Sequence, residues 1–567
     1  MIASSHHRTL LPAACQAALP LLILALAALP SARAELSFQI EPRVPVGECF
    51  NFWSIKNFTY QDIFDQPLGR EAFRRNHPYT RYVNCVRLIG GRGDGKNRWL
   101  LRVEADGRQV TDFTGMIRYL RAIQEWGYTP RIVLDNVPTE LSEPGRPMHT
   151  YGNTYPPIDY DAYHRYLRAV VEAMVQAFGR ETVARWRFRV MTEPDLNPGH
   201  WAASKEEFLR LYDYAVDAVT HVLPEADIGP GNILNPVKHQ KWGLDIIDHC
   251  ATGKNYRTGQ TGTRMRYFSC SWYGAVNEPV SSLTESVRLI RERLGKYPKF
   301  RDLPVEVAEF ALLHDENKRR YYCGDGTEWS ASWLASVAAL AWDLNLPQVH
   351  QWATTTAIDT APDAPSFEEA RRLMPDGMTV PYTHVLGMLE AMAGGQRLRV
   401  QPAGSAGATE GADCGIIACR KQNEILLLAF HHQPGRAKGA PVQANLEIGP
   451  LVAGEPGSWT LSEWLIDAGH SNFTRALVGD CTAAGLTVVT DKAPSFAANI
   501  VETFGLEGVK IWRQNLARYQ DLAALYAVRQ NEACPDGPDG RLRLSLTLPS
   551  HSVRFLRLQR SAARPGP

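Results

Sequence analysis

Two glutamates near the ends of strand-like runs are the residues of this sequence best suited to paired acid–base and nucleophilic chemistry. Glu193 closes the run "RWRFRVMTE", and Glu309 lies much later, in "LPVEVAEFA". Two carboxyl groups in one cleft can hydrolyse a glycosidic bond: a protonated one gives its proton to the leaving oxygen, while an ionised one attacks the anomeric carbon. Alone, Glu193 would be an ordinary surface acid, and Glu306 is an alternative to Glu309. The hypothesis therefore requires a fold that brings the pair together.

The segment from residue 48 to about residue 355 alternates short apolar runs with amphipathic helical patterns, one of which opens with a capping box at Ser204 and Glu207. Eight runs are candidate strands: "CFNFWSI", "YVNCVRLIGG", "TPRIVLDNV", "RWRFRVMTE", "ADIGPGNIL", "RYFSCSWYG", "LPVEVAEFA" and "PQVHQWATT". Eight strands that alternate with helices predict an α/β fold, the parallel (β/α)8 TIM barrel.

Reactive groups of such barrels sit at the C-terminal ends of the strands. Glu193 ends the fourth run and Glu309 lies at the end of the seventh, so the two are expected to face each other across the barrel mouth. Strand alternation predicts that Glu306 and Glu309 point to opposite faces, and its place at the strand end favours Glu309.

The texture of the sequence changes beyond about residue 395, where short strands such as "EILLLAFHH" and "RLRLSLTLPSHSVRFLRLQR" are separated by Gly, Pro and polar turns. This pattern predicts a C-terminal all-β, sandwich-like accessory domain. The expected division is a signal peptide over 1–34, a catalytic barrel over 35–395 and the β-sandwich domain over 396–567. Residues 35–45 are alternatively a strand of the β domain.

The N-terminus has the pattern of an export signal. His6, His7 and Arg8 precede an apolar run over 17–29, and Ala32 and Ala34 fit a cleavage site after Ala34. A membrane anchor is the alternative, but the run is shorter than the ~20 residues that span a bilayer. We expect export to the periplasm or the medium, with no stable membrane anchor after cleavage.

The composition argues against several other classes of function. The 567 residues include 61 basic and 60 acidic ones, a net charge of +1, so no overall field attracts nucleic acid. No CxxC pair occurs, and His249, His314 and Asp315 lack ligand spacing, so neither a metal nor a cofactor is expected. The spacing leaves two disulfide pairings open, Cys414 with Cys419 and Cys481 with Cys534.

The motifs around both glutamates resemble those of the clan A glycoside hydrolases, most of all family 39, the β-xylosidase and α-L-iduronidase family. That family's acid/base motif reads Trp-Asn-Glu-Pro-Asn-Leu, followed by Phe-Trp; here residues 191–196 read Met-Thr-Glu-Pro-Asp-Leu, followed by His200 and Trp201. The nucleophile motif resembles Thr-Glu-Trp, and residues 308–310 read Ala-Glu-Phe. The resemblance extends over most of residues 45–560.

The resemblance implies a retaining glycosidase in which Glu193 is the acid/base and Glu309 the nucleophile, with oligo- or polysaccharide as substrate. Tyr273 is expected to hydrogen-bond Glu309, and Arg87 to keep Glu309 charged. The expected substrate-binding residues, of which the tryptophans are alternatively core aromatics, are Arg87, Thr192, Trp53, Trp272, Tyr273 and Trp352.

Three departures from the family pattern affect the residues that read the sugar. Thr192 replaces the Asn that in the clan binds the sugar 2-hydroxyl, and Ile89 and Ser271 replace histidines of the second and sixth strands. They motivate an alternative hypothesis, a non-catalytic carbohydrate-binding protein derived from such an enzyme.

Two further motifs are weaker candidates. Glu278, in "VNEP", copies the acid motif literally but follows the sixth strand in a loop. The stretch 90–97, "GGRGDGKN", nearly matches a phosphate loop, but it lacks the final Ser or Thr and the helix that must follow. Asp195 is expected outside the carboxylate contact, serving its loop or the next helix.

Overall fold

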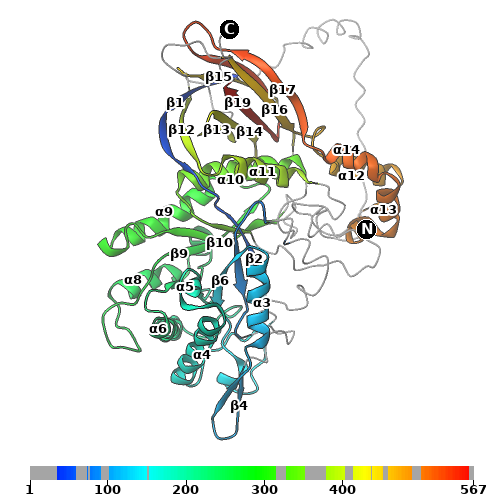
Figure 1. The fold of residues 1–567 in the computed structure, drawn as a ribbon. Coiled ribbons are helices and arrows are strands. Elements are labelled where there is room, and N and C mark those ends of the chain that lie inside the picture. The colour runs from blue at the N-terminus through cyan, green and yellow to red at the C-terminus, as the bar shows by residue number, and fades with distance from the viewer. Residues whose placement is uncertain are drawn as a thin grey trace, which may run out of the picture.

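In the computed structural model, the residues whose structure is described are 35–58, 73, 77–90, 101–149, 152–314, 327–351, 379–402, 413–435, 437–450, 458–487 and 500–560 (Figure 1). The expected signal peptide and Trp352 lie outside these ranges, as does most of the phosphate-loop-like stretch.

Eight strands form one parallel sheet in the order β8-β7-β6-β3-β2-β11-β10-β9. Its ends are joined by Ile233, whose N–H donates to the Ser269 carbonyl and whose carbonyl accepts from the Ser271 N–H. Each predicted run overlaps one of these strands, so the predicted barrel is confirmed. The strands are β2 (Trp53–Phe58), β3 (Tyr82–Val86), β6 (Thr129–Leu134), β7 (Arg187–Val190), β8 (Asp227–Pro230), β9 (Phe268–Ala275), β10 (Val305–His314) and β11 (Val349–Gln351).

The helices that surround the barrel begin where the sequence supplies caps. Asp159 accepts from two backbone N–H groups at the start of α4, and Ser204 accepts from the Glu207 N–H at the start of α6, as its capping box predicts. The helices of this part are α3 (Thr114–Glu125), α4 (Tyr160–Phe178), α5 (Arg180–Ala184), α6 (Lys205–Val222), α7 (Pro236–His239), α8 (Asp245–Thr252), α9 (Ser282–Gly295), α10 (Glu328–Asp343) and α11 (Pro381–Met392). Short elements add β4 (Leu101–Val103), β5 (Gln109–Thr111), and the 3-10 turns η1 (Thr139–Leu141), η2 (Trp242–Leu244) and η3 (Pro298–Phe300).

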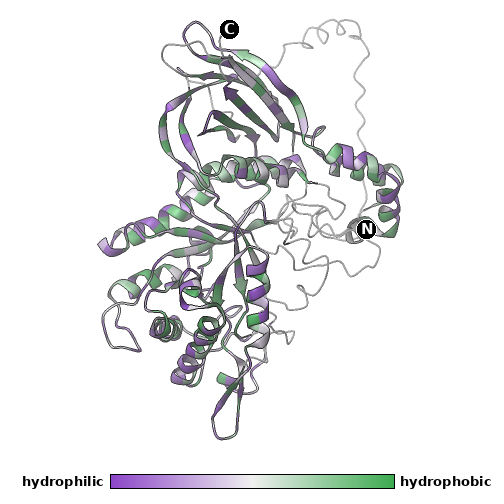
Figure 2. Cartoon of the chain, viewed as in Figure 1, coloured by the Kyte–Doolittle hydropathy of each residue, from purple (hydrophilic) through white to green (hydrophobic). Residues whose placement is uncertain are grey.

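Hydropathy follows burial in these helices. In Figure 2, α4 and α6 carry both hydrophilic and hydrophobic residues, as expected of helices with one face on the barrel. Helix α10 is pale to green along its length, and nearly all of its residues are buried, because it packs between the barrel and the second, nine-stranded sheet, called the upper sheet below.

The upper domain is a nine-stranded sheet in the order β17-β16-β19-β14-β13-β12-β1-β15-β18. Strand β1 pairs with β12 and β15, so residues 35–49 belong to this sheet and not to the barrel. The sheet curls around one apolar core that includes Ile40, Leu427 and Leu556, which makes it sandwich-like. Its strands are β1 (Glu35–Cys49), β12 (Gly395–Pro402), β13 (Asp413–Lys421), β14 (Glu424–His432), β15 (Val442–Ile448), β16 (Ser458–Ile466), β17 (Tyr526–Pro535), β18 (Leu542–Leu548) and β19 (Ser552–Arg560).

A helical segment between β16 and β17 was not predicted. It comprises α12 (Thr474–Ala483), α13 (Ile500–Gln514) and α14 (Leu516–Ala523), so the C-terminal domain is not all β. Asn472 and Arg475 at its start donate to Glu328, at the start of α10. This contact ties the helical segment to the barrel side of the molecule.

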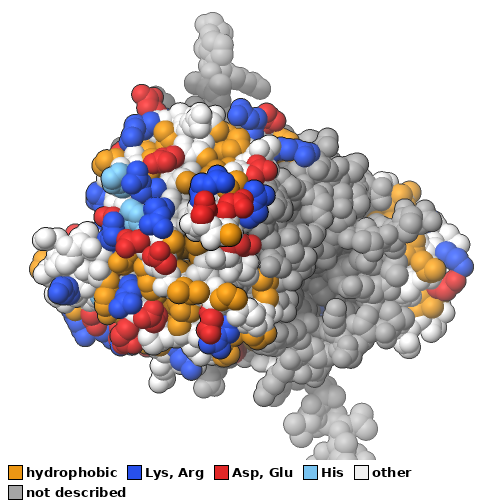
Figure 3. Space-filling model, turned by 90° about the horizontal axis from the view of Figure 1, so that it is seen from below, with side chains coloured by type: hydrophobic (Ala, Val, Ile, Leu, Met, Phe, Trp, Pro, Cys, Tyr) orange, Lys and Arg blue, Asp and Glu red, His pale blue; other side chains and the backbone are white. Residues whose placement is uncertain are grey.

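The described residues also bear on metal ligands, membrane-spanning helices, disulfides and surface charge. Within these ranges no cluster of three or more metal-ligating side chains occurs, and no helix has the length and hydropathy to cross a membrane. Cys414, Cys419, Cys481 and Cys534 are free thiols, so neither open disulfide pairing forms. The face shown in Figure 3 carries basic and acidic side chains interspersed, in line with the balanced composition.

Candidate active site

Glu193 follows β7 at the rim of the barrel and is almost fully buried, with 6% of its surface exposed. Its backbone has φ +43°, in the left-handed region that non-glycine residues rarely adopt, and its N–H donates to the Asn232 carbonyl at 2.9 Å. Met191, two residues earlier, also has a positive φ of 70°. Strained backbone of this kind is often found at functional sites, where the surrounding structure holds it.

Both carboxyl oxygens of Glu193 have a neighbouring polar group. The Ser271 hydroxyl donates to Oε1 at 2.5 Å, and the Asn232 side-chain amide donates to the Ser271 oxygen at 2.8 Å. Nδ1 of His200 lies 3.4 Å from Oε2. Sequence reasoning assigned no role to Asn232 or His200, although His200 was visible as a departure from the Phe of the family motif.

Glu309 lies in β10, which pairs with β9, the strand that carries Ser271. The Tyr273 hydroxyl donates to its Oε2 at 2.5 Å, so the expected hydrogen bond between these two residues is confirmed. In the parallel register of β9 and β10, Glu309 is the partner of Ser271, the residue that contacts Glu193. Both glutamates are therefore held at one level of the barrel, around Ser271.

Glu306 does not point away from Glu309, and the expectation of opposite faces is wrong. A register shift between Val307 and Glu309 inserts one extra residue in β10, so that Glu306 pairs with Ser269 and Glu309 with Ser271. Positions that differ by two on β9 share a face, and the bulge puts both glutamates on it.

The partners of Glu306 show its role. It accepts from Arg131 of β6 at 3.1 Å and from Arg187 of β7, across the barrel interior, and His350 lies 4.0 Å away. Glu306 is thus a buried ion-pair residue within the barrel, below the rim that carries Glu309.

A network that the sequence did not reveal centres on Asp135, at the end of β6. Asp135 accepts from the Arg87 backbone N–H at 2.6 Å, from the Arg87 guanidinium at 2.9 Å and from the Thr192 hydroxyl at 2.8 Å. The guanidinium also donates to Asn136. Arg87 has φ +58° and is buried, so Asp135 fixes an otherwise strained residue at the rim. The signal that could have found Asp135 is its place at the end of the third predicted strand.

Asp195 joins the loop after β7 to the loop after β8, as its expected loop role requires. Its Oδ1 accepts from the Leu234 N–H at 3.0 Å. Burial, and secondarily the negative charge of Glu193, raise the pKa of Asp195 to about 7.

Glu278, the literal copy of the acid motif, is half exposed and pairs with Lys238 at 2.5 Å. The side chains described above beside Glu193 and Glu309 do not include Glu278.

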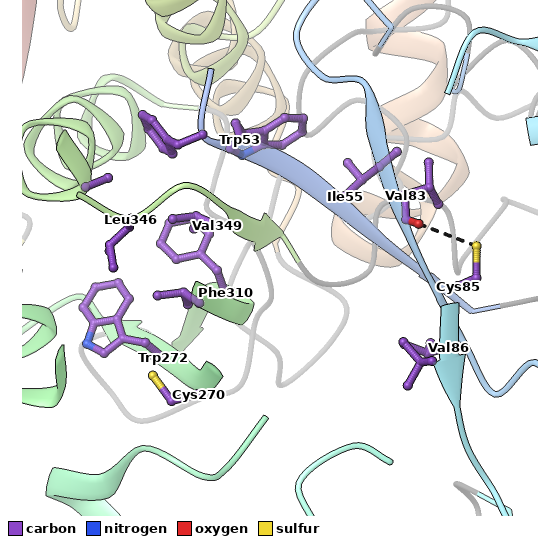
Figure 4. Close-up of a cluster of buried hydrophobic side chains, with 14 of the residues drawn as sticks. Trp53, Ile55, Val83, Cys85, Val86, Cys270, Trp272, Phe310, Leu346 and Val349 are labelled. Carbon is purple, nitrogen blue, oxygen red and sulfur yellow. Dashed lines mark hydrogen bonds between the residues drawn. The ribbon is translucent and has the colours of Figure 1, made fainter. Parts of the chain in front are cut away.

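The tryptophans fall in different places. Trp272 stacks on Phe310 at 5.8 Å and on Trp333 at 6.0 Å, in the apolar core between β9, β10 and α10 (Figure 4). It alternates with Ser271 and Tyr273 and so lies on the opposite face from the two glutamates. Trp53 is buried at the start of β2, where it lines a small cavity with Tyr79 and residues of α11.

Comparisons with known proteins bear on this site. The family model "Glycosyl hydrolases family 39" matches residues 92–433. An α-1,4-L-rhamnosidase of Formosa agariphila is 26% identical over 275 residues, covering 45% of this chain and 53% of that protein. A β-xylosidase of Geobacillus stearothermophilus is 25% identical over 218 residues, 37% of this chain and 43% of its own. The human α-L-iduronidase is 29% identical over 133 residues, which cover 23% of this chain and 20% of that protein. The chain thus spans about half the length, or less, of these relatives.

Solved structures share the whole architecture. The crystal structure of a monomeric β-xylosidase from Caulobacter crescentus CB15 has a TM-score of 0.66 at 16% identity, covering 93% of this chain and 100% of that one. The GH39 enzyme from Xanthomonas axonopodis pv. citri has a TM-score of 0.67 at 14% identity, with coverage of 94% and 99%. At these identities the likeness concerns the fold. The family model, however, covers more than half of the sequence and includes the strand ends that carry Glu193, Ser271 and Glu309, and the chain belongs to glycosyl hydrolases family 39.

Proposed function

We propose that the protein is a retaining glycoside hydrolase, with Glu193 as acid/base and Glu309 as nucleophile. The observation that carries the proposal is the arrangement around β9: Ser271 donates to Glu193, Tyr273 donates to Glu309, and Ser271 is the register partner of Glu309. Two buried carboxyl groups, each accepting from a hydroxyl donor on β9, support this assignment.

The reaction has two displacements. In the first, a Glu309 oxygen bonds to the anomeric carbon, the glycosidic C–O bond breaks, and the Glu193 proton passes to the leaving oxygen. In the second, water attacks the anomeric carbon, Glu193 takes the water proton, and the bond to Glu309 breaks. Glu309 needs an oriented oxygen for this attack, which the Tyr273 hydrogen bond supplies.

The substrate proposed is an oligo- or polysaccharide outside the cytoplasm. The basic and apolar N-terminal stretch of residues 6–34 supports export, to the periplasm or the medium. The activities after which the relatives are named, rhamnosidase, β-xylosidase and iduronidase, define the sugars to test first.

The test is to trap the covalent intermediate. The protein is incubated with 2-fluoro-xylosyl, 2-fluoro-rhamnosyl and 5-fluoro-iduronosyl fluorides, and peptides are analysed by mass spectrometry. We expect one sugar adduct on Glu309, absent from the Glu309→Gln variant. Adduct on another carboxylate would overturn the assignment of the nucleophile. Sugar binding by calorimetry, with neither adduct nor turnover of aryl glycosides and polysaccharides, would favour the carbohydrate-binding alternative.

A further inference from the structure

Among the described residues, His200 places its imidazole beside the acid/base, and its own loop holds it there. The Leu196 N–H donates to the Glu193 carbonyl at 2.9 Å, and the His200 N–H donates to the Leu196 carbonyl at 2.8 Å, so the chain folds back over Glu193. The next residue, Trp201, is fully buried, and its indole donates to the Ser204 carbonyl at 2.9 Å. These bonds leave the His200 ring, 6% exposed, facing Oε2 of Glu193.

The two carboxyl oxygens of Glu193 therefore have different neighbours, a hydroxyl donor at Oε1 and an imidazole near Oε2. Ser271 accepts from Asn232, an amide donor, and gives its own hydrogen to Oε1. With Oε1 occupied as an acceptor, the exchangeable proton of the neutral carboxyl belongs on Oε2, the oxygen that faces His200. A buried carboxylate needs a donor at each oxygen, and for the ionised form His200 is the group near Oε2 that can donate.

We propose, on the basis of the function proposed above, that His200 is a positioning residue for the acid/base. Its Nδ1–H donates to Oε2 when Glu193 is ionised, and its ring fixes the direction in which the Oε2 proton is delivered. The family motif has Phe at this position and His at the position of Ser271. In this chain the imidazole near the acid/base thus comes from the loop after β7, while Ser271 takes the place on β9.

Other titratable or charged groups lie on the elements packed around Glu193, and each contributes to the pH dependence of its activity. Asp195 belongs to the same loop, and Tyr273 and Glu309 belong to β9 and β10. Arg87 and Asp135 lie at the rim after β3 and β6, where Asp135 accepts from Thr192, the residue before Glu193.

The first test compares His200→Phe, which has the family residue, with His200→Asn, which keeps a donor. The readout is the pH profile of kcat/KM on two aryl glycosides of the sugar that the enzyme turns over, with a dinitrophenyl and a methoxyphenyl leaving group. His200→Phe should lower kcat/KM on the methoxyphenyl substrate roughly tenfold to hundredfold, since proton donation as a whole contributes about 10²–10⁴. The dinitrophenyl substrate, which leaves without a proton, should change little.

The alkaline limb of the pH profile should move to higher pH in His200→Phe, because the Glu193 carboxylate loses a hydrogen-bond donor. In His200→Asn, which keeps a donor, the limb should lie close to its wild-type position. The matched control is His221→Phe, on the exposed end of α6, which should leave both substrates unchanged. Equal losses on both leaving groups with an unmoved pH profile would show a merely structural role and overturn the proposal.

A second measurement needs no substrate. The Tm of wild type and His200→Phe is compared from about pH 5 to about pH 9; a contact that depends on protonation makes the Tm difference vary with pH, whereas lost packing gives a constant offset. A constant offset would contradict the proposal even where no substrate is found. Failure of the proposed function is a separate outcome, since it would appear as full activity in Glu309→Gln.

Discussion

Ser271 and Glu309 are register partners on the parallel strands β9 and β10, and the Ser271 hydroxyl donates to Glu193 at 2.5 Å. Neighbouring strands lie about 4.7–4.9 Å apart. Ser271 on β9 is therefore linked to both acids: it donates to Glu193, from the loop after β7, and it pairs in register with Glu309 on the neighbouring strand β10.

The bulge in β10 allows the same substitution to be compared at two sites three residues apart. Glu309→Gln should reduce turnover at least about 10³-fold, since it removes the attacking oxygen anion. Its Tm should stay nearly unchanged, because the Gln oxygen can still accept from the Tyr273 hydroxyl. Glu306→Gln should keep most of kcat but lose about 3–5 kcal/mol of unfolding free energy, because Arg131 and Arg187 are left without their buried partner. Steady-state kinetics and urea unfolding measure the two effects. The opposite assignment, activity lost in Glu306→Gln with stability kept, would make Glu306 the functional acid.

The barrel could be predicted because each of its strands is a short apolar run bounded by turn residues, and such runs are local in the sequence. The position of Glu193 followed from its strand end in the same way. The face of Glu306 could not be predicted by alternation, since the extra residue between Val307 and Glu309 appears only in the pairing with β9. A bulge depends on the partner strand, and no signal for it was read from β10 itself.

The polar residues around the glutamates show the same limit. Asp135 and Asn232 act through contacts with Arg87, Thr192 and Ser271, which are distant in sequence, so motif spacing does not reveal these contacts. Their place near the ends of predicted strands is the one local signal that they carry. The helices α12 to α14 were not predicted; they are inserted between β16 and β17, two strands that pair with each other in the sheet. The place of Trp272 in the core follows from simple alternation with Ser271 and Tyr273, a test that the sequence did permit.

Asp195 provides a prediction about pH and stability. Its pKa is raised to about 7 from 3.8, so the folded state binds its proton more tightly than the unfolded chain does. The stability gained in this way is complete below about pH 4 and is lost as the pH rises through about 7. Asp195→Asn has no such loss, so its Tm relative to wild type should rise between about pH 5 and about pH 8.5. Thermal unfolding across this range measures the difference.

The same variant separates Asp195 from the chemistry. Asn keeps an oxygen that can accept from the Leu234 N–H, so kcat should fall by less than about tenfold, against the 10²–10⁴ expected for Glu193→Gln. A loss in Asp195→Asn as large as that in Glu193→Gln would place Asp195 in the reaction.

The interface between the barrel and the upper sheet should be acid-sensitive. His432 of β14 is fully buried against α10, where its Nδ1 lies 3.0 Å from the Ser332 hydroxyl and its ring 5.0 Å from Trp329. Burial, and then the positive charges of His551 and His431, lower the pKa of His432 well below 6.5.

Because the folded pKa is depressed, this stability is present above about pH 6.5 and is lost as the pH falls below it. Tm should therefore decrease from about pH 7.5 to about pH 5, and His432→Gln should flatten that decrease while lowering Tm at neutral pH. His221→Gln, an exposed control on α6, should keep the wild-type slope. An unchanged slope in His432→Gln would assign the acid sensitivity to other groups.

The stereochemical outcome depends on the separation of the two carboxyl groups. A nucleophilic Glu309 must reach the anomeric carbon directly, which requires about 5–5.5 Å between the carboxyls, whereas an inverting enzyme needs about 6.5–9.5 Å to admit a water molecule. The retaining mechanism proposed above requires the shorter separation. We therefore expect the first-formed sugar to keep the anomeric configuration of the substrate, as followed by ¹H NMR in the first minutes of hydrolysis, and methanol to be glycosylated with the same configuration. An inverted first product would mean that a water molecule lies between Glu309 and the sugar, and Glu309 would then be the base that activates it.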